Sequence, residues 1–243
     1  MRVGRLGRWA ALLLAALAAT ALYQLATWPD VAALAREMPK STAFIEHWQA
    51  AERKAGRSGR VDWRPVTWSR ISTEVKLAVL CGEDVDFFSH HGFAVAEIKE
   101  AVADALREGE IPRGASTITQ QLAKNLWLSP SRNPWRKAKE ALLTRQLERA
   151  LSKRRILEVY LDVAEFGDGI WGVEAAARRY FGVSAAELDG RQAAALAASL
   201  PRPAKWHPGV TSRGYQSSIG RIQARMRTFG WLRREIVAAG GAP

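Results

Sequence analysis

The sequence contains few of the residues that build disulfide or metal frameworks. Its only cysteine, Cys81, excludes an internal disulfide framework and any Cys-rich zinc or iron–sulfur site. The apolar neighbours Ala78, Val79 and Leu80 predict that this thiol is buried. The chain shows no internal repeat, no low-complexity linker and no alternating pattern long enough to require a sheet. With 48% hydrophobic residues in 243, it is neither disordered nor fibrous, and one large domain is expected.

Long uncharged runs are also rare, and the one that exists lies near the N-terminus. Arg2, Arg5 and Arg8 precede an apolar run from Trp9 to Trp28. As a helix, residues 10–28 would cover roughly 28 Å, close to the hydrocarbon thickness of a bilayer. The pattern therefore predicts a cytoplasmic tail (1–9), one transmembrane helix (10–28), a membrane-proximal connection (29–70) and an extracytoplasmic domain (71–243) at the cytoplasmic (inner) membrane. The alternative is a cleaved signal peptide ending near Ala19-Thr20-Ala21, which also exports the domain.

Acidic side chains are outnumbered, 24 against 36 basic ones, for a formal charge of +12. Residues 184–243 carry nine of the basic groups and three acids, so half of the excess lies in a quarter of the chain. On an exported domain, such a surface favours anionic membrane lipids or a lipid-linked phosphate, and nucleic acid is not an expected partner. A solvated surface without a partner remains the alternative. A helical stripe near the C-terminus, flanked by arginines, is a candidate lipid contact; it comprises Ile219, Ile222, Met226, Phe229 and Leu232.

Helix start signals recur along the rest of the chain. Asn133-Pro134 and Ser152 are candidate N-caps, each preceding a run with helical periodicity. Ser184-x-x-Glu187 and Asp189-x-x-Gln192 have the form of capping boxes. The fold class predicted from these signals is mainly α.

The first stretch with chemical potential places three carboxylates beside two imidazoles and aromatic rings. Glu83, Asp84 and Asp86 precede His90 and His91. A carboxylate among apolar groups and other acids has a raised pKa, which suits a general base or acid. A surface loop explains the pattern equally well, and adjacent histidines are a poor metal site.

The second stretch runs from Arg113 to Asn125. Thr117-x-x-Gln120 can form a capping box, which would open a helix whose free backbone amides attract anions. Thr117, Gln120, Gln121 and Lys124 share one face of that helix. An ordinary amphipathic surface helix is the alternative.

The third and fourth stretches are more ambiguous. Arg136 and Glu140 are spaced i, i+4, which by itself indicates an ion pair within a helix. In the fourth stretch, Ile156 and Tyr160 belong to a packing face, and Lys153 is the residue with chemical interest.

Taken in order, these stretches resemble the peptidoglycan glycosyltransferases of family 51. The resemblance covers about Val75 to Pro203 and is carried by ED-x-x-F-x-x-H-x-G, G-x-STITQQLAKN, RK-x-x-E, K-x-x-ILE-x-YL and GIWGVEAAARRYFG. Two positions depart from the family pattern: Ala115 stands where a second Gly is frequent, and Asp162 where Asn is usual.

The resemblance implies that the enzyme polymerises lipid II into β-1,4-linked glycan strands by inverting transfer, with release of undecaprenyl diphosphate. It implies that Glu83 is the general base and that Asp84 supports it. Glu140 would help to position the leaving group or a divalent cation such as Mg²⁺ or Mn²⁺, and no organic cofactor is expected. The remaining implied site residues are substrate contacts: diphosphate-binding Lys124 and Arg136, cleft-lining Ser116, Gln120 and Gln121, and the supporting cation Lys153.

The resemblance also implies a lysozyme-like helical large lobe with a small jaw lobe. Lipid II and the growing lipid-linked glycan are the implied partners, with other cell-wall synthesis or division proteins as further candidates. Neither S-x-x-K nor K-T-G occurs, so no transpeptidase activity is expected. Two alternatives stay open: a lytic murein-cleaving enzyme, which has no need of diphosphate-binding cations, and a non-enzymatic cell-wall scaffold, whose role would survive replacement of Glu83.

Overall fold

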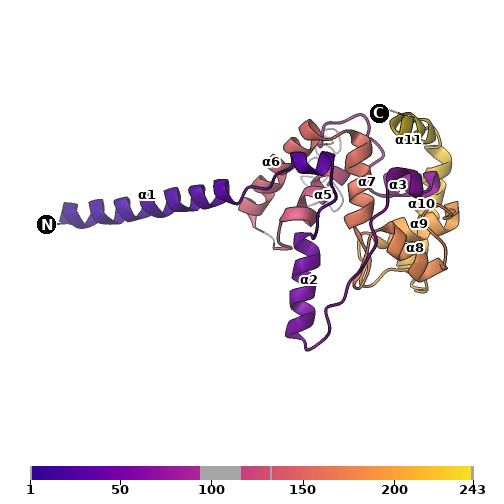
Figure 1. The fold of residues 1–243 in the computed structure, drawn as a ribbon, viewed down its shortest axis with the longest axis horizontal. Helices are drawn as coiled ribbons and strands as arrows, with labels where there is room; N and C mark the ends of the chain where they lie inside the picture. The colour runs from indigo at the N-terminus through magenta and orange to yellow at the C-terminus, as the bar shows by residue number, and fades with distance from the viewer. Residues whose placement is uncertain (1, 94–115, 132, 242–243) are drawn as a thin grey trace, which may run out of the picture. The chain divides into compact units, whose positions relative to one another are not determined.

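A computed structural model describes residues 2–93, 116–131 and 133–241. The chain divides into two compact units, residues 1–30 and 31–243. The described residues are mainly helical, as predicted (Figure 1).

The first unit contains helix α1 (Arg2–Ala26). Its large apolar side chains are exposed, among them Trp9 (71%) and Leu22 (67%). By length and hydropathy together, no helix among the residues the structure describes qualifies as a membrane span. The predicted transmembrane helix is therefore not confirmed, although the segment is helical.

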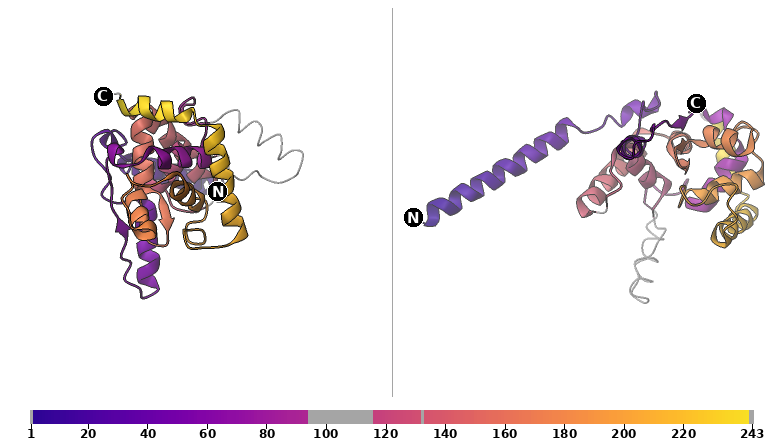
Figure 2. Two further views of the ribbon diagram at one scale, coloured as in Figure 1. Left: turned by 90° about the vertical axis from the view of Figure 1, so that its right-hand side faces the viewer. Right: turned by 90° about the horizontal axis from the view of Figure 1, so that it is seen from below.

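One group of helices in the second unit is built around α3 (Thr73–Glu83). Helices α9 (Gly190–Ser199), α10 (Arg213–Thr228) and α11 (Leu232–Gly241) all pack against α3 (Figure 2). Seven consecutive residues of α3, from Val75 to Cys81, are buried. The predicted burial of Cys81 is therefore confirmed. Burial on every side fixes the position of the last residue of α3, Glu83.

A second group is built around α5 (Ile118–Trp127). Helices α2 (Ala43–Lys54), α6 (Pro134–Ala150) and α7 (Lys153–Val163) pack against α5. Helix α7 also contacts α11 and α8 (Val173–Phe181), which join the two groups. Two short 3₁₀ turns, η1 (Ala32–Ala35) and η2 (Trp68–Arg70), precede α2 and α3 respectively.

A small sheet, which the sequence pattern did not predict, lies beyond the C-terminus of α7. Its order is β1-β3-β2, with β1 (Asp62–Trp63) parallel to β3 (Ile170–Trp171) and β2 (Glu165–Gly167) antiparallel to it. Gly172 follows β3 at φ +82°, where a Cβ would stand 2.6 Å from the carbonyl oxygen of Asp162. Strands of two or three residues carry too little periodicity to be recognised in a sequence.

The predicted helix starts are confirmed at four places and wrong at one. Asn133, Ser152 and Asp189 each accept backbone N–H bonds at the starts of α6, α7 and α9, and Thr117 does so for α5. Ser184 does bond to Glu187, but this local pair closes a turn and no helix follows.

The predicted lipid contact of the C-terminal stripe is wrong at three of its five positions. Ile222, Met226 and Leu232 are buried. Ile222 lies against α3: a Cβ added at Gly82 would stand 3.3 Å from the Cδ1 atom of Ile222. The apolar periodicity therefore reflects packing of α10 and α11 in the core, and the flanking Arg221 and Arg227 are exposed.

Candidate active site

The candidate base, Glu83, is the last residue of α3 and faces α5. Its Oε2 accepts a hydrogen bond of 2.7 Å from the side-chain amide of Gln121. Burial raises the pKa of the Glu83 carboxyl, while the Gln121 hydrogen bond and the charge of Lys124 oppose that shift. A carboxylate with a raised pKa is a stronger proton acceptor, as general-base catalysis requires.

The side-chain amide of Gln121 is oriented by hydrogen bonds to Tyr160 and Ser116. The hydroxyl of Tyr160 donates to Gln121 Oε1 at 2.9 Å, and the amide nitrogen of Gln121 also reaches the carbonyl oxygen of Ser116 at 3.3 Å. Burial raises the pKa of the Tyr160 phenol well above its ordinary value, so the phenol remains a donor. Tyr160 thus orients the amide N–H toward Glu83. Sequence reasoning placed Tyr160 in a packing face, and nothing in the pattern distinguished its hydroxyl.

Asp84 is buried and bound to protein groups. Its carboxylate accepts the backbone N–H of Ile118, the first residue of α5, at 2.9 Å and contacts Nε2 of His90 at 2.9 Å. Since the N–H of Gly92 donates to Nδ1 of His90, a neutral His90 carries its proton on Nε2 and donates it to Asp84. The helix start that was predicted to attract an anion is therefore occupied by Asp84. This residue joins the end of α3 to the beginning of α5.

The predicted capping box of α5 is present. The hydroxyl of Thr117 accepts from the Gln120 backbone, and Gln120 Oε1 accepts the backbone N–H of Thr117 at 3.0 Å. The buried Gln120 side chain is thus part of the cap, whereas Ser116 is half-buried just before it. The first two positions of this motif, Gly114 and Ala115, lie outside the described residues. The Thr117 hydroxyl also donates a hydrogen bond of 2.8 Å to the carbonyl oxygen of Gly92, which links the start of α5 to the segment after α3.

Lys124 lies one helical turn beyond Gln121 on the same face of α5. Burial lowers the pKa of its ammonium, while the charges of Glu140 and Glu83 oppose that effect. Its Nζ is 5.6 Å from the centre of the Phe44 ring on α2. Among the described residues it makes no ion pair or hydrogen bond, which leaves its donors available to a substrate.

Glu140 is buried in α6 with cations on both oxygens. Arg136 donates to Oε2 at 2.7 Å, which confirms the predicted i, i+4 pair, and Lys137 donates to Oε1. Arg136 Nε is buried and has no partner among the described residues. The arrangement gathers the cations of Arg136, Lys137 and Lys124 around one carboxylate.

Lys153 is paired with Glu148, a residue that sequence reasoning missed. Its Nζ lies 2.8 Å from Glu148 Oε1 and 4.5 Å from the centre of the Phe87 ring. The same Glu148 oxygen accepts the hydroxyl of Thr119 at 2.5 Å. The spacing of Glu140, Thr144 and Glu148 at i, i+4 and i+8 on α6 was the available signal. Lys153 therefore supports the packing of α5, α6 and α7 around the site.

The described side chains do not fit a divalent cation at Glu140. Both carboxylate oxygens are engaged by cations, and no group of three His, Cys, Asp or Glu side chains gathers anywhere in the described ranges. Positive charge at this place comes from arginine and lysine.

Comparison with known proteins supplies the context for this geometry. Residues 49–227 match the family model described as Transglycosylase. The chain is 42% identical over 212 residues to a protein of Laribacter hongkongensis, covering 87% of this chain and 93% of that one. It is 44% identical to a protein of Thiobacillus denitrificans (87% and 91% covered) and 48% identical to one of Pseudomonas putida (74% and 71% covered). All three relatives are named biosynthetic peptidoglycan transglycosylase.

Proposed function

Because this chain belongs to the transglycosylase family and is a peptidoglycan glycosyltransferase that polymerises glycan strands, we propose that Glu83 is its general base. The acceptor sugar hydroxyl attacks the anomeric carbon of the lipid-linked donor. Glu83 takes the hydroxyl proton as the new glycosidic bond forms and the bond to the diphosphate breaks. Attack opposite to the leaving group inverts the anomeric carbon. Lipid II and the growing glycan are the substrates.

The leaving diphosphate gains negative charge, so it requires cations that are already in place. Lys124 and Arg136 supply them. Glu140 holds Arg136 by a hydrogen bond of 2.7 Å and so acts on the leaving group through that guanidinium. The donor N–H groups of Arg136 that do not face Glu140 remain for phosphate oxygens. No step in this scheme requires a metal ion.

One observation supports these roles above the others: a single cation, Lys124, interacts electrostatically with both Glu83 and Glu140. The Lys124 ammonium is therefore within electrostatic range both of the base and of the carboxylate that binds Arg136. A lytic enzyme needs the base, but it has no diphosphate for these cations to bind.

The test is polymerisation of labelled lipid II by the full-length protein. We expect Glu83→Gln to lower kcat by about 10²- to 10⁴-fold, the usual contribution of a general base. Glu140→Gln should lower it as well, because Arg136 loses its anchor. Glu46→Gln, a matched change of an exposed glutamate on α2, should leave the rate unchanged. Full activity of a folded Glu83→Gln protein would refute the assignment, and an inactive wild type would favour the scaffold alternative.

Peptidoglycan synthesis places the protein in the cell envelope. We propose further that α1 holds it at the cytoplasmic membrane with the catalytic unit outside. The exposed apolar side chains of α1 support this location, because such surface is stabilised by leaving water. The two helix groups, around α3 and around α5, support the arrangement that the resemblance implies, a lysozyme-like large lobe with a smaller jaw lobe. Fractionation of the full chain against a chain lacking residues 1–30 tests the anchor, and equal distribution of both in the soluble fraction would refute it.

A further inference from the structure

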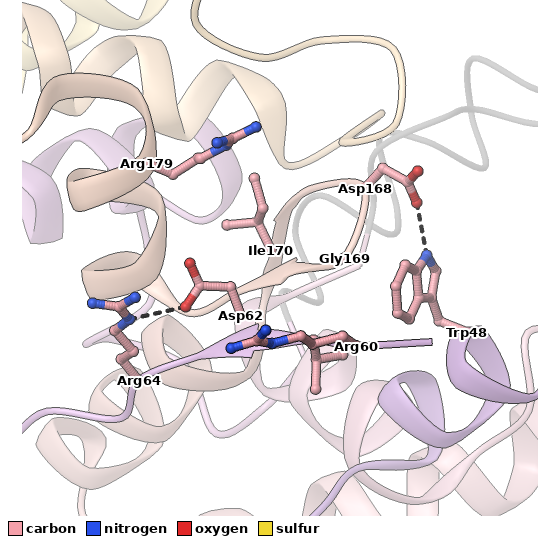
Figure 3. A pocket seen from close by; sticks show the side chains of 9 residues that line it. Trp48, Arg60, Asp62, Arg64, Asp168, Gly169, Ile170 and Arg179 are labelled. Atoms are coloured by element: carbon pink, nitrogen blue, oxygen red, sulfur yellow. Dashed lines mark hydrogen bonds and ion pairs between the residues drawn. The ribbon is translucent and has the colours of Figure 1, made fainter. Parts of the chain in front are cut away.

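A cavity of about 390 Å³ lies between α2, the sheet and α8, apart from the residues assigned above. Three arginines on its lining define it as the arginine pocket: Arg60, Arg64 and Arg179. Figure 3 shows Arg64 and Arg179 on one side of the cavity and Trp48 on the other, with Ile170 between. Its volume is within the range of small-molecule binding sites.

The lining has an excess of positive charge. Arg64 pairs with Asp62 at 2.9 Å, and Asp168 accepts the indole N–H of Trp48 at 2.7 Å. The side chains of Arg60 and Arg179 make no ion pair or hydrogen bond with another residue in the part of the chain that the structure describes. Two guanidinium groups are therefore available, and their planar N–H donors match a carboxylate.

The cavity also offers apolar contact of fixed shape. Gly169, at φ +72°, approaches the Trp48 ring so closely that a Cβ would stand 2.8 Å from it. The indole is thus held by packing and by its bond to Asp168. Together with Ile170, Trp48 can contact aliphatic parts of a ligand whose carboxylate meets the arginines.

Helix α2 connects this cavity to the candidate active site. Phe44, whose ring lies beneath the Lys124 ammonium, and Trp48 are spaced i, i+4 on α2. Residues at this spacing have Cβ atoms roughly 5–6 Å apart on one helix face. The ring that contacts Lys124 and the indole that lines the arginine pocket are therefore one helical turn apart along α2.

We propose that the arginine pocket binds a carboxylate of the peptide carried by the glycan substrate, with Arg60 and Arg179 as its partners. The proposal rests on the proposed function, because it is peptidoglycan synthesis that supplies a sugar bearing a peptide. A diphosphate is the less suitable occupant, since Lys124 and Arg136 already provide cations at the reaction centre. By binding the peptide, the pocket would favour glycan substrates that carry it.

The test compares wild type with the double variant Arg60→Gln/Arg179→Gln, using the full-length protein. The two substrates are lipid II with a free peptide carboxylate and lipid II with that carboxylate amidated. For the free carboxylate we expect the variant to raise KM about tenfold with kcat retained, the effect of losing roughly one charge-assisted contact. The amidated substrate should show the high KM with both proteins. Arg213→Gln, at an exposed arginine beginning α10 and outside the pocket, is the matched control and should leave KM unchanged.

A second readout does not depend on catalysis. Titration calorimetry with a soluble disaccharide bearing the peptide should show about tenfold weaker binding to the double variant. Equal KM values for wild type and variant on the free carboxylate, or equal increases on both substrates, would overturn the proposal. If the wild type makes no glycan, the proposed function fails, and calorimetry still decides whether the pocket binds the peptide.

Discussion

Replacement of Asp162 by asparagine should stabilise the protein, and more so at alkaline pH. Asp162 is fully buried at the end of α7. Its Oδ1 accepts the backbone N–H of Val66 at 3.1 Å, whereas Oδ2 is buried without a partner among the described residues. Burial, with a smaller contribution from the charge of Glu158, raises the pKa of this carboxyl from 3.8 to about 7. Asparagine keeps the acceptor for Val66 and carries no charge.

The magnitude follows from proton linkage. Between about pH 4 and pH 7 the folded protein holds a proton on Asp162 that the unfolded chain has lost, so stability falls as pH rises through this window and is level above it. A shift of about three pKa units corresponds to roughly 4 kcal/mol in full, of which about 2–3 kcal/mol develops between pH 5 and pH 8. The asparagine variant escapes this loss.

Equilibrium urea unfolding of the full chain in non-ionic detergent, at pH 5 and pH 8, measures the effect. The gain from Asp162→Asn should be about 2–3 kcal/mol larger at pH 8. Asp86→Asn, an identical change at an exposed position, is the control and should show no such difference. The same gain at both pH values would refute the reasoning, because it would mean that Asp162 does not change its protonation in this range.

Two further predictions concern single contacts. Tyr160→Phe removes the hydroxyl that orients Gln121, so Glu83 loses a hydrogen bond that favours its charged form. The polymerisation rate should therefore fall about tenfold at pH 6 and by less at pH 8. An unchanged pH–rate profile would contradict this role of Tyr160. Gly172→Ala should cost about 2–4 kcal/mol in urea unfolding, because a positive φ is combined with a close backbone contact. Gly209→Ala, at φ +100° with open space around it, should cost only about 1 kcal/mol, and equal costs would show that the contact is unimportant.

Where local chemistry decides structure, the sequence was sufficient. The caps at Thr117, Asn133, Ser152 and Asp189 are interactions between residues three positions apart or fewer, and all are present. At Ser184 the same rule predicted one hydrogen bond correctly, from the Ser184 N–H to the Glu187 carboxylate, but the Ser184 hydroxyl donates to Glu187 and does not accept its backbone N–H. The predicted helix is wrong, because a local side-chain pair cannot by itself stabilise the turns that follow it.

By itself, the sequence determined the helical class, the i, i+4 pair of Arg136 and Glu140, and the motifs that indicate the family, because these depend on residue type and short spacing. Tertiary structure alone decided that Asp84 occupies the start of α5, although it is 34 positions away from Ile118 in the sequence. It alone also decided that Tyr160 orients Gln121, which is 39 positions away. It also decided that α2 and α8 enclose the arginine pocket. Such contacts form where packing brings distant segments together, and no local pattern records which segments those are.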